Sequence, residues 1–114
     1  MPYYLLQVAY EPTAIADLIA NPQDRSEAIR PVVEKLGGRI ETFYLAFGEY
    51  DVIAIVEMKG NVGAAAFSLA ASAGGAVKAI KTTPLMTGNE GLEAFKQAAS
   101  CGYKAPAAAK TKTA

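Results

Sequence analysis

The chain has 114 residues, of which 52% are apolar, and its formal net charge is zero. A chain of this length forms one domain and buries enough surface to fold without a disulfide or a structural metal. It has no histidine and one cysteine, Cys101, which excludes a disulfide framework, histidine-dependent nucleophile pairs and the commonest zinc and iron ligand. No run of 18 apolar residues and no signal-peptide pattern is present, so we expect a cytoplasmic protein with no membrane partner.

The charges are divided unevenly along the chain. Residues 103–114 carry three lysines and no acid among Ala, Thr and Pro, whereas residues 1–102 have eight basic residues against eleven acidic ones. The end of the chain has too little apolar bulk to offset the entropy of ordering it. We therefore predict a folded domain over residues 1–102 and a disordered Ala/Lys-rich tail over residues 103–114. The acidic balance of the folded part argues against a nucleic-acid partner.

The first third of the chain predicts one strand and two helices. Tyr3–Tyr10 is rich in aromatic and aliphatic residues and predicts a mostly buried strand. Pro12–Ala20 has apolar residues at helical spacing. A second helix is expected to begin at Pro22, with Asn21 as its N-cap, and to end at Gly37-Gly38.

Two apolar, alternating runs follow, Arg39–Phe47 and Tyr50–Met58, separated by Gly48-Glu49. They predict a β-hairpin, and a two-residue loop with glycine in first position favours a type II′ turn. The segment Phe47–Asp51 is therefore expected to set the register between the two strands.

The remaining part of the chain predicts a helix, a strand and a last helix. Val62–Ala73 consists of small residues, which allow close packing on a sheet, and Asn61 is its expected N-cap. Val77–Thr83 predicts a strand, and Pro84 indicates that this strand lies at a sheet edge. The last helix spans about residues 90–100. One of its faces carries the apolar side chains Leu92, Phe95 and Ala99.

The order strand-helix-strand-strand-helix-strand, with a C-terminal helix, is the α+β ferredoxin-like βαββαβ plan. It predicts a four-stranded antiparallel sheet with helices on one face, and right-handed crossovers place Tyr3–Tyr10 and Tyr50–Met58 at the centre. The other face then has no cover within the chain. A sheet with two apolar faces needs a second cover, so the expected partner is another copy of the protein, in a homodimer or a larger homo-oligomer.

Alternation along the strands divides the side chains between the two faces of the sheet. The set expected to face the helices from the third strand is Val52, Ala54, Val56 and Met58. The opposite face, to which Ile40 is also assigned, combines aliphatic and polar groups as small-molecule pockets do. Its candidate ligand-binding residues are Tyr3, Gln7, Thr42, Tyr44, Ile55 and Glu57. The alternative is a dimer interface whose polar groups pair across a two-fold axis, and the two interpretations are compatible.

Five segments have the order and spacing of a known family. They are Met1-Pro2-Tyr3-Tyr4, Asn21-Pro22-Gln23-Asp24-Arg25, Glu34-Lys35-Leu36-Gly37-Gly38, Phe47-Gly48-Glu49-Tyr50-Asp51, and Ser72-Ala73-Gly74-Gly75 through Lys81-Thr82-Thr83-Pro84-Leu85. Together they cover about residues 1–95, and over this range the chain resembles the GYD domain family. Glu49, between the Gly and the Tyr of the family's name, is ordinary variation there.

The resemblance implies a dimeric α/β barrel, in which two ferredoxin-like sheets face each other. It implies no reaction, because the family is functionally uncharacterised. Barrels of this class include cofactor-independent monooxygenases, haem chlorite dismutases and the ligand-sensing domain of Lrp/AsnC regulators, and the fold alone does not decide among them. The absence of histidine argues against haem, and we expect neither a cofactor nor a metal.

Two functions stay open at this stage. The favoured one is non-catalytic, a homodimeric or higher-order module that binds a small molecule or serves assembly. The alternative is a cofactor-independent enzyme of monooxygenase or isomerase type, which needs a base within reach of its substrate. No catalytic residue is assigned; the candidate bases are Glu57 and Asp51. Asp51 has a structural alternative, since it can accept backbone hydrogen bonds and pin the hairpin.

Overall fold

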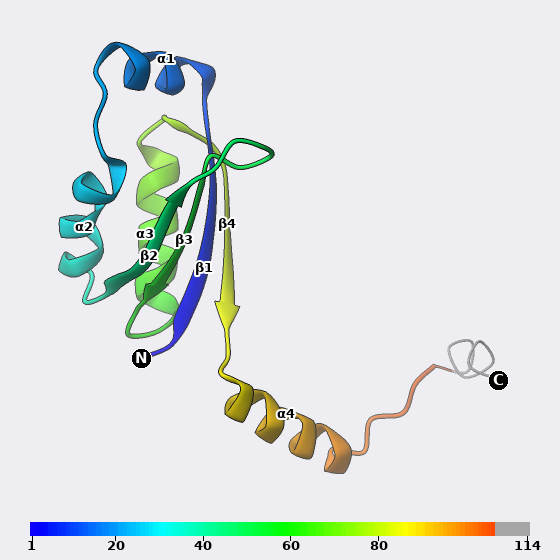
Figure 1. Cartoon of the computed structure of the whole chain (residues 1–114). Helices are drawn as coiled ribbons and strands as arrows, with labels where there is room; N and C mark the ends of the chain where they lie inside the picture. The colour runs from blue at the N-terminus through cyan, green and yellow to red at the C-terminus, as the bar shows by residue number, and fades with distance from the viewer. Residues whose placement is uncertain (107–114) are drawn as a thin grey trace.

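Strands and helices follow one another in the predicted order in a computed structural model that describes residues 1–106 (Figure 1). The strands are β1 (Tyr3–Tyr10), β2 (Arg39–Leu45), β3 (Val52–Glu57) and β4 (Val77–Leu85). The helices are α1 (Pro12–Ala20), α2 (Arg25–Lys35), α3 (Asn61–Ala73) and α4 (Gly88–Ser100). None of the helices in this part of the chain has the length and apolar composition needed to cross a membrane. Most of the tail predicted to be disordered, residues 107–114, lies outside the described residues.

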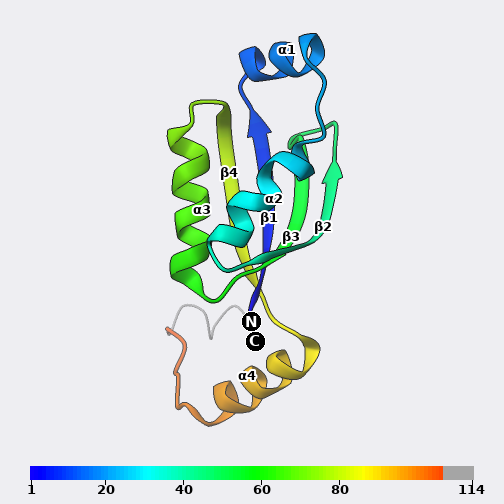
Figure 2. The ribbon, with the colours of Figure 1, turned by 90° about the vertical axis from the view of Figure 1, so that its left-hand side faces the viewer.

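The four strands form one antiparallel sheet in the order β2-β3-β1-β4, which is the predicted ferredoxin-like α+β arrangement. The two central strands are β1 and β3, as expected from right-handed crossovers. Pro84 lies in the edge strand β4, where a residue without an N–H is tolerated. Helices α2 and α3 lie on the same face of the sheet, and α1 lies beyond one end of it (Figures 1 and 2).

The core lies between the sheet and helices α2 and α3. Alternate side chains of the central strands are buried there: Tyr4, Leu6 and Val8 from β1, and Val52, Ala54 and Val56 from β3, followed by Met58. Opposite them, α2 contributes Val33 and α3 contributes Ala64 and Phe67. Burying each large apolar side chain stabilises the fold by about 1.5–3 kcal/mol. The predicted division of β1 and β3 between two faces is confirmed, because alternation is a local property of a strand.

An irregularity in β2 overturns one assignment. The pairing between β2 and β3 shifts register, so that Ile40 is opposite Val56 whereas Thr42 is opposite Ile55. Glu41 is the extra residue of this bulge, and residues before it face the other way from simple alternation. Ile40 therefore packs against the core rather than on the helix-free face.

The connection between β2 and β3 is longer than the predicted two-residue turn. It spans residues 46–51 and is closed by a hydrogen bond of 2.7 Å that the Ala46 amide donates to the Asp51 carbonyl. A type II′ turn requires a positive φ at its first central residue, and Gly48 is not among the positive-φ glycines of the described chain. The type II′ prediction is therefore wrong, because the strands stop pairing before their apolar patterns end.

Local capping also differs from the predictions. The N-cap of α2 is Asp24 rather than Asn21, since the Asp24 side chain accepts a hydrogen bond from Ser26 N at 2.9 Å. Asn61 is the first residue of α3 and does not cap it. Its Oδ1 instead accepts a hydrogen bond of 2.7 Å from the Tyr4 hydroxyl, which ties the start of α3 to β1.

Helix α4 leads away from the sheet and extends the molecule to 58 Å (Figures 1 and 2). It begins with a capping box, in which Thr87 and Glu90 each accept a hydrogen bond from the other's backbone. None of its residues is buried, and its apolar side chains Leu92 and Phe95 are 50% and 77% exposed. Its apolar face therefore has no full cover within the described chain.

Replacing Gly38 by alanine is expected to destabilise the domain. A Cβ at this position would meet the Met58 sulfur and the Glu57 carbonyl oxygen, and the latter cannot move without shifting β3. We expect the free energy of unfolding, measured by urea denaturation, to fall by about 2–3 kcal/mol. Gly91→Ala is the control, because nothing lies within 4 Å of a Cβ there. Equal stability of the two variants would contradict the close approach at Gly38.

Candidate functional site

The sheet face opposite α2 and α3, here called the open face, consists of three rows of side chains. Each row takes one residue from β2, β3, β1 and β4 in turn. The first row is Tyr44, Ile53, Gln7 and Lys81; the second is Thr42, Ile55, Leu5 and Thr83; the third is Arg39, Glu57, Tyr3 and Leu85. Apolar residues occupy much of the central strands, and polar groups lie mostly toward the edges.

All six residues predicted to bind a ligand lie on the open face. They are Tyr3, Gln7, Thr42, Tyr44, Ile55 and Glu57. They are spread over all three rows, so they form a broad surface rather than one cluster. The β2 side of this surface is well exposed, with Tyr44 at 67% and Ile53 at 37%, whereas the β1 residues are partly covered. Ligand binding by these residues stays a prediction.

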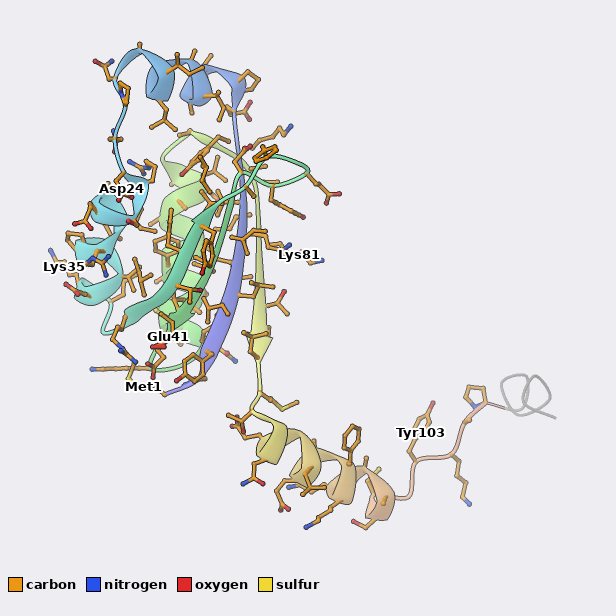
Figure 3. All side chains as sticks on the ribbon, in the orientation of Figure 1. Met1, Asp24, Lys35, Glu41, Lys81 and Tyr103 are labelled. Carbon is orange, nitrogen blue, oxygen red and sulfur yellow. The ribbon has the colours of Figure 1, made fainter. Side chains whose placement is uncertain are left out.

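The register places Lys81 of β4 on the open face. The pairing of β1 with β4 shifts register beside Ala9, and Lys81 is opposite Gln7. Lys81 therefore belongs to the first row, and Figure 3 shows its side chain directed away from α2 and α3. A cation at this position adds a charged group to one edge of the open face.

An ion cluster occupies the β2 end of the third row. Arg39 Nη2 contacts the Glu57 carboxylate and lies 2.6 Å from Glu41 Oε1. The hydrogen bond that Arg39 donates to Glu57, followed by the charges of both glutamates, raises the pKa of Arg39 above its ordinary value. Arg39 is largely exposed, so water screens the attraction. Glu57 is therefore paired with a permanent cation, whereas a general base needs a carboxylate that is free to accept a proton.

An open hollow of about 310 Å³ lies next to this cluster. Its lining joins Tyr3, Glu41 and Ile55 to the segment Leu85–Thr87, which leads into α4. Two predicted ligand-binding residues, Tyr3 and Ile55, therefore border one concavity. Apolar walls with a hydroxyl and a carboxylate among them are typical of small-molecule sites. The sequence pattern did not indicate the contribution of Glu41, because the bulge that exposes it depends on pairing with β3.

Asp51, the second candidate base, is engaged in backbone hydrogen bonds. Its Oδ2 accepts a hydrogen bond of 2.8 Å from Tyr10 N, and its own N–H donates one of 2.7 Å to the Val8 carbonyl. Val8 is the last residue of β1 that pairs with β3, so Asp51 continues the attachment of β1 beyond the ladder. The Asp51 carboxylate therefore accepts a backbone hydrogen bond as expected, but the donor belongs to β1 rather than to the turn.

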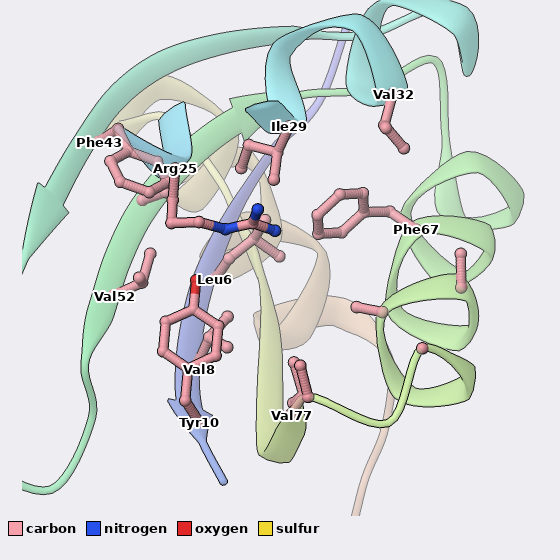
Figure 4. A pocket seen from close by; sticks show the side chains of 15 residues that line it. Leu6, Val8, Tyr10, Arg25, Ile29, Val32, Phe43, Val52, Phe67 and Val77 are labelled. Carbon is pink, nitrogen blue, oxygen red and sulfur yellow. The ribbon is translucent and has the colours of Figure 1, made fainter. Parts of the chain in front are cut away.

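A second space, here called the helix-side cavity, lies on the other side of the sheet beneath α2 and α3 (Figure 4). Its volume is about 360 Å³. Most of its walls are apolar: Leu6, Val8, Ile29, Val32, Phe43, Val52, Ala54, Phe67 and Val77. Small residues complete the wall at the end of α3: Ala70 and Ala71 within the helix and Gly74 just after it. These small residues leave room that bulkier side chains would fill.

Arg25 and Tyr10 bring polar groups to the helix-side cavity, and Figure 4 shows both side chains directed into it. Arg25 Nη1 donates a hydrogen bond of 2.9 Å to the Gln23 side chain, a neutral partner. No carboxylate pairs with Arg25 in residues 1–106, whereas Arg30 and Arg39 each pair with glutamates. The sequence pattern did not reveal this cavity, because the small residues of α3 predict close packing equally well.

Asp24 anchors the first turn of α2, the turn that carries Arg25. Its Oδ1 accepts hydrogen bonds from Ser26 Oγ at 2.6 Å and from Ser26 N at 2.9 Å. These hydrogen bonds lower the pKa of Asp24 below its ordinary value of 3.8. Asp24 is therefore ionised at neutral pH and holds the start of α2 in place beside the cavity.

Fold and surface together define a ferredoxin-like α+β domain with one covered and one uncovered sheet face. A comparison with protein families matches residues 4–95, most of the chain, to the GYD domain. The protein therefore belongs to the GYD domain family, which confirms the resemblance seen in its five sequence segments. Neither the curated proteins nor the solved structures contain a match to this chain.

Removing the Asp51 side chain is expected to destabilise the domain. In Asp51→Ala the Tyr10 amide loses its acceptor, and an unpaired backbone donor costs about 1–2 kcal/mol, measurable by urea denaturation. Asp51→Asn keeps an acceptor and is expected to lose less. Glu49→Ala, an exposed change in the same loop, is the control. If Asp51→Ala unfolds at the same urea concentration as Glu49→Ala, the pinning role is wrong.

The first turn of α2 is expected to loosen in acid. Because the folded-state pKa of Asp24 is lowered, its contribution to stability is fully present above the unfolded value of 3.8. This contribution is lost as the pH falls through the lower folded-state pKa. NMR titration of the Ser26 amide reports the transition, and Asp24→Asn, which caps without titrating, is expected to abolish it. A transition at or above pH 3.8 would contradict the hydrogen-bonded cap.

Proposed function

We propose that this GYD domain protein is a non-catalytic module that assembles into a homodimer or a larger homo-oligomer through its open face. The observation that carries the proposal is the uncovered sheet face, on which Ile53 is 37% exposed and Tyr44 67% exposed. A sheet face that exposes aliphatic side chains on its central strands is stabilised when another layer covers it. A second copy presents the same surface, and a two-fold axis lets equivalent rows meet.

A small molecule between the paired sheets is the second part of the proposal. The hollow lined by Tyr3, Glu41 and Ile55 is open to solvent on one side. A facing sheet would roof it and convert it into an enclosed site, with Gln7 and Glu57 on the same face near by. Ligand sites are commonly concave, largely apolar and located at interfaces, which favours this position.

The enzyme alternative has less support from the geometry. Its base would be Glu57 or Asp51, and both carboxylates already have partners, Arg39 for the first and the Tyr10 amide for the second. A general base must be free to accept a proton from the substrate. The non-catalytic role therefore accounts for more of the arrangement.

Native mass spectrometry of the protein purified from its source tests this function. The expected result is a mass at least twice the chain mass of 11.9 kDa, with any retained small molecule visible as an added mass. Ile53→Lys places a charge in the middle of the open face, and we expect it to shift the protein to monomers because a buried unpaired charge is strongly unfavourable.

The matched control is Val62→Lys on α3, a side chain that is 86% exposed and lies outside the open face. This variant is expected to keep the wild-type mass. A wild-type protein that is monomeric at micromolar concentration would overturn the assembly proposal. Equal loss of assembly in Val62→Lys and Ile53→Lys would place the interface elsewhere.

A further inference from the structure

The helix-side cavity is larger than an ordinary packing defect and is partly open to solvent, since Val32, Ala70 and Gly74 in its lining are exposed. Protein interiors are close-packed, and voids larger than a water molecule are few. A space of about 360 Å³ lies instead within the range of small-molecule pockets, roughly 300–1,000 Å³. Its apolar walls offer water few hydrogen-bond partners, so an apolar occupant fits better than a water cluster.

The shape of the cavity follows from residue size on α3. Phe67 is the one bulky α3 side chain in the lining, whereas Ala70 and Ala71 of α3 and Gly74 just after it add little volume. On the sheet side, Val8 and Val52 belong to the rigid central strands. The sheet side of the cavity is therefore bounded by strands that the core holds in position, whereas Gly74 and Ala76 of the α3–β4 connection complete the other side.

The polar groups of the cavity are one cation, the Arg25 guanidinium, and one neutral hydroxyl, that of Tyr10. Arg25 is the one charged residue among those that line it, and within residues 1–106 it has no acidic partner. Its recorded bond to Gln23 uses one of five guanidinium N–H donors. The Tyr10 hydroxyl, also directed into the cavity, has no hydrogen-bond partner within residues 1–106. Both groups are available to an incoming acceptor.

We propose that the helix-side cavity binds an amphipathic monocarboxylate, with its apolar body among the valine, leucine and phenylalanine side chains and its carboxylate on Arg25 and Tyr10. A guanidinium matches the planar geometry of a carboxylate through two parallel N–H···O bonds. Because the cavity has a single cation, it favours a ligand that carries one negative charge. This site lies on the opposite side of the sheet from the open face, so the proposal does not depend on assembly.

The probe for this site is octanoate, and 1-octanol is its uncharged counterpart. Binding is followed by ¹H–¹⁵N NMR titration of the full chain. We expect saturable shifts, at one octanoate per chain, for amides around Arg25, Phe67 and Val77. Octanoate is expected to bind about tenfold more tightly than 1-octanol, the factor that one charge-assisted hydrogen bond of about 1.5 kcal/mol supplies.

Two pairs of variants separate charge from shape. Arg25→Gln is expected to lower the octanoate affinity about tenfold and to leave 1-octanol unchanged, whereas Arg30→Gln, on the same helix but outside the cavity, keeps the preference. Ala71→Leu fills the cavity and is expected to abolish binding of both probes. Ala65→Leu, an exposed change on α3, is its control.

Several results would overturn the proposal. One is equal affinity for octanoate and 1-octanol in the wild type, and another is an unchanged octanoate affinity in Arg25→Gln. A third is a set of shifts at Tyr44 and Ile53 instead of the cavity. A fourth is nuclear Overhauser contacts of Leu92 or Phe95 with Phe67, which would mean that α4 of a second copy fills the space. Native mass spectra of Arg25→Gln show independently whether assembly persists.

Discussion

The antiparallel pairing of β1 with β3 is the interaction on which the rest of the structure depends. It places Tyr4, Leu6 and Val8 beside Val56, Ala54 and Val52, and α2 and α3 bury this one layer of side chains. The same pairing necessarily directs the intervening residues to the other face. One face thus carries the core and the helix-side cavity, and the other is a surface of aliphatic and polar side chains that nothing in residues 1–106 covers fully, because α2 and α3 lie on one side of the sheet.

Small departures from regular pairing adjust what each face presents. The bulge at Glu41 returns Ile40 to the core and brings Glu41 to the hollow, where Arg39 holds it together with Glu57. Asp51 fastens β1 where the ladder with β3 ends. These features place polar groups at defined points of the sheet, and each of these carboxylates already has a hydrogen-bond or ion-pair partner.

The two faces leave two separate spaces for small molecules. The hollow on the open face is bordered by the segment leading into α4 and needs a second layer to close it. The helix-side cavity is lined by the sheet, α2 and α3 of the same chain and contains Arg25, which has no acidic partner in residues 1–106. Under the proposed assembly a second copy closes the first space, whereas the second depends on residue size at the C-terminal end of α3.

The sequence by itself determined the order of elements, the central strands, the buried set of β1 and β3 and the GYD family, because alternation and family motifs are local in the chain. It also placed all six candidate residues on one face. Only the tertiary structure decided that Ile40 packs against the core and that the loop spans residues 46–51. It also decided that Arg39 pairs with Glu57 and that a cavity lies beside Arg25. Each of these features depends on how strands distant in sequence pair, or on the volume left between packed elements. The spacing of residues along one segment determines neither the pairing nor that volume.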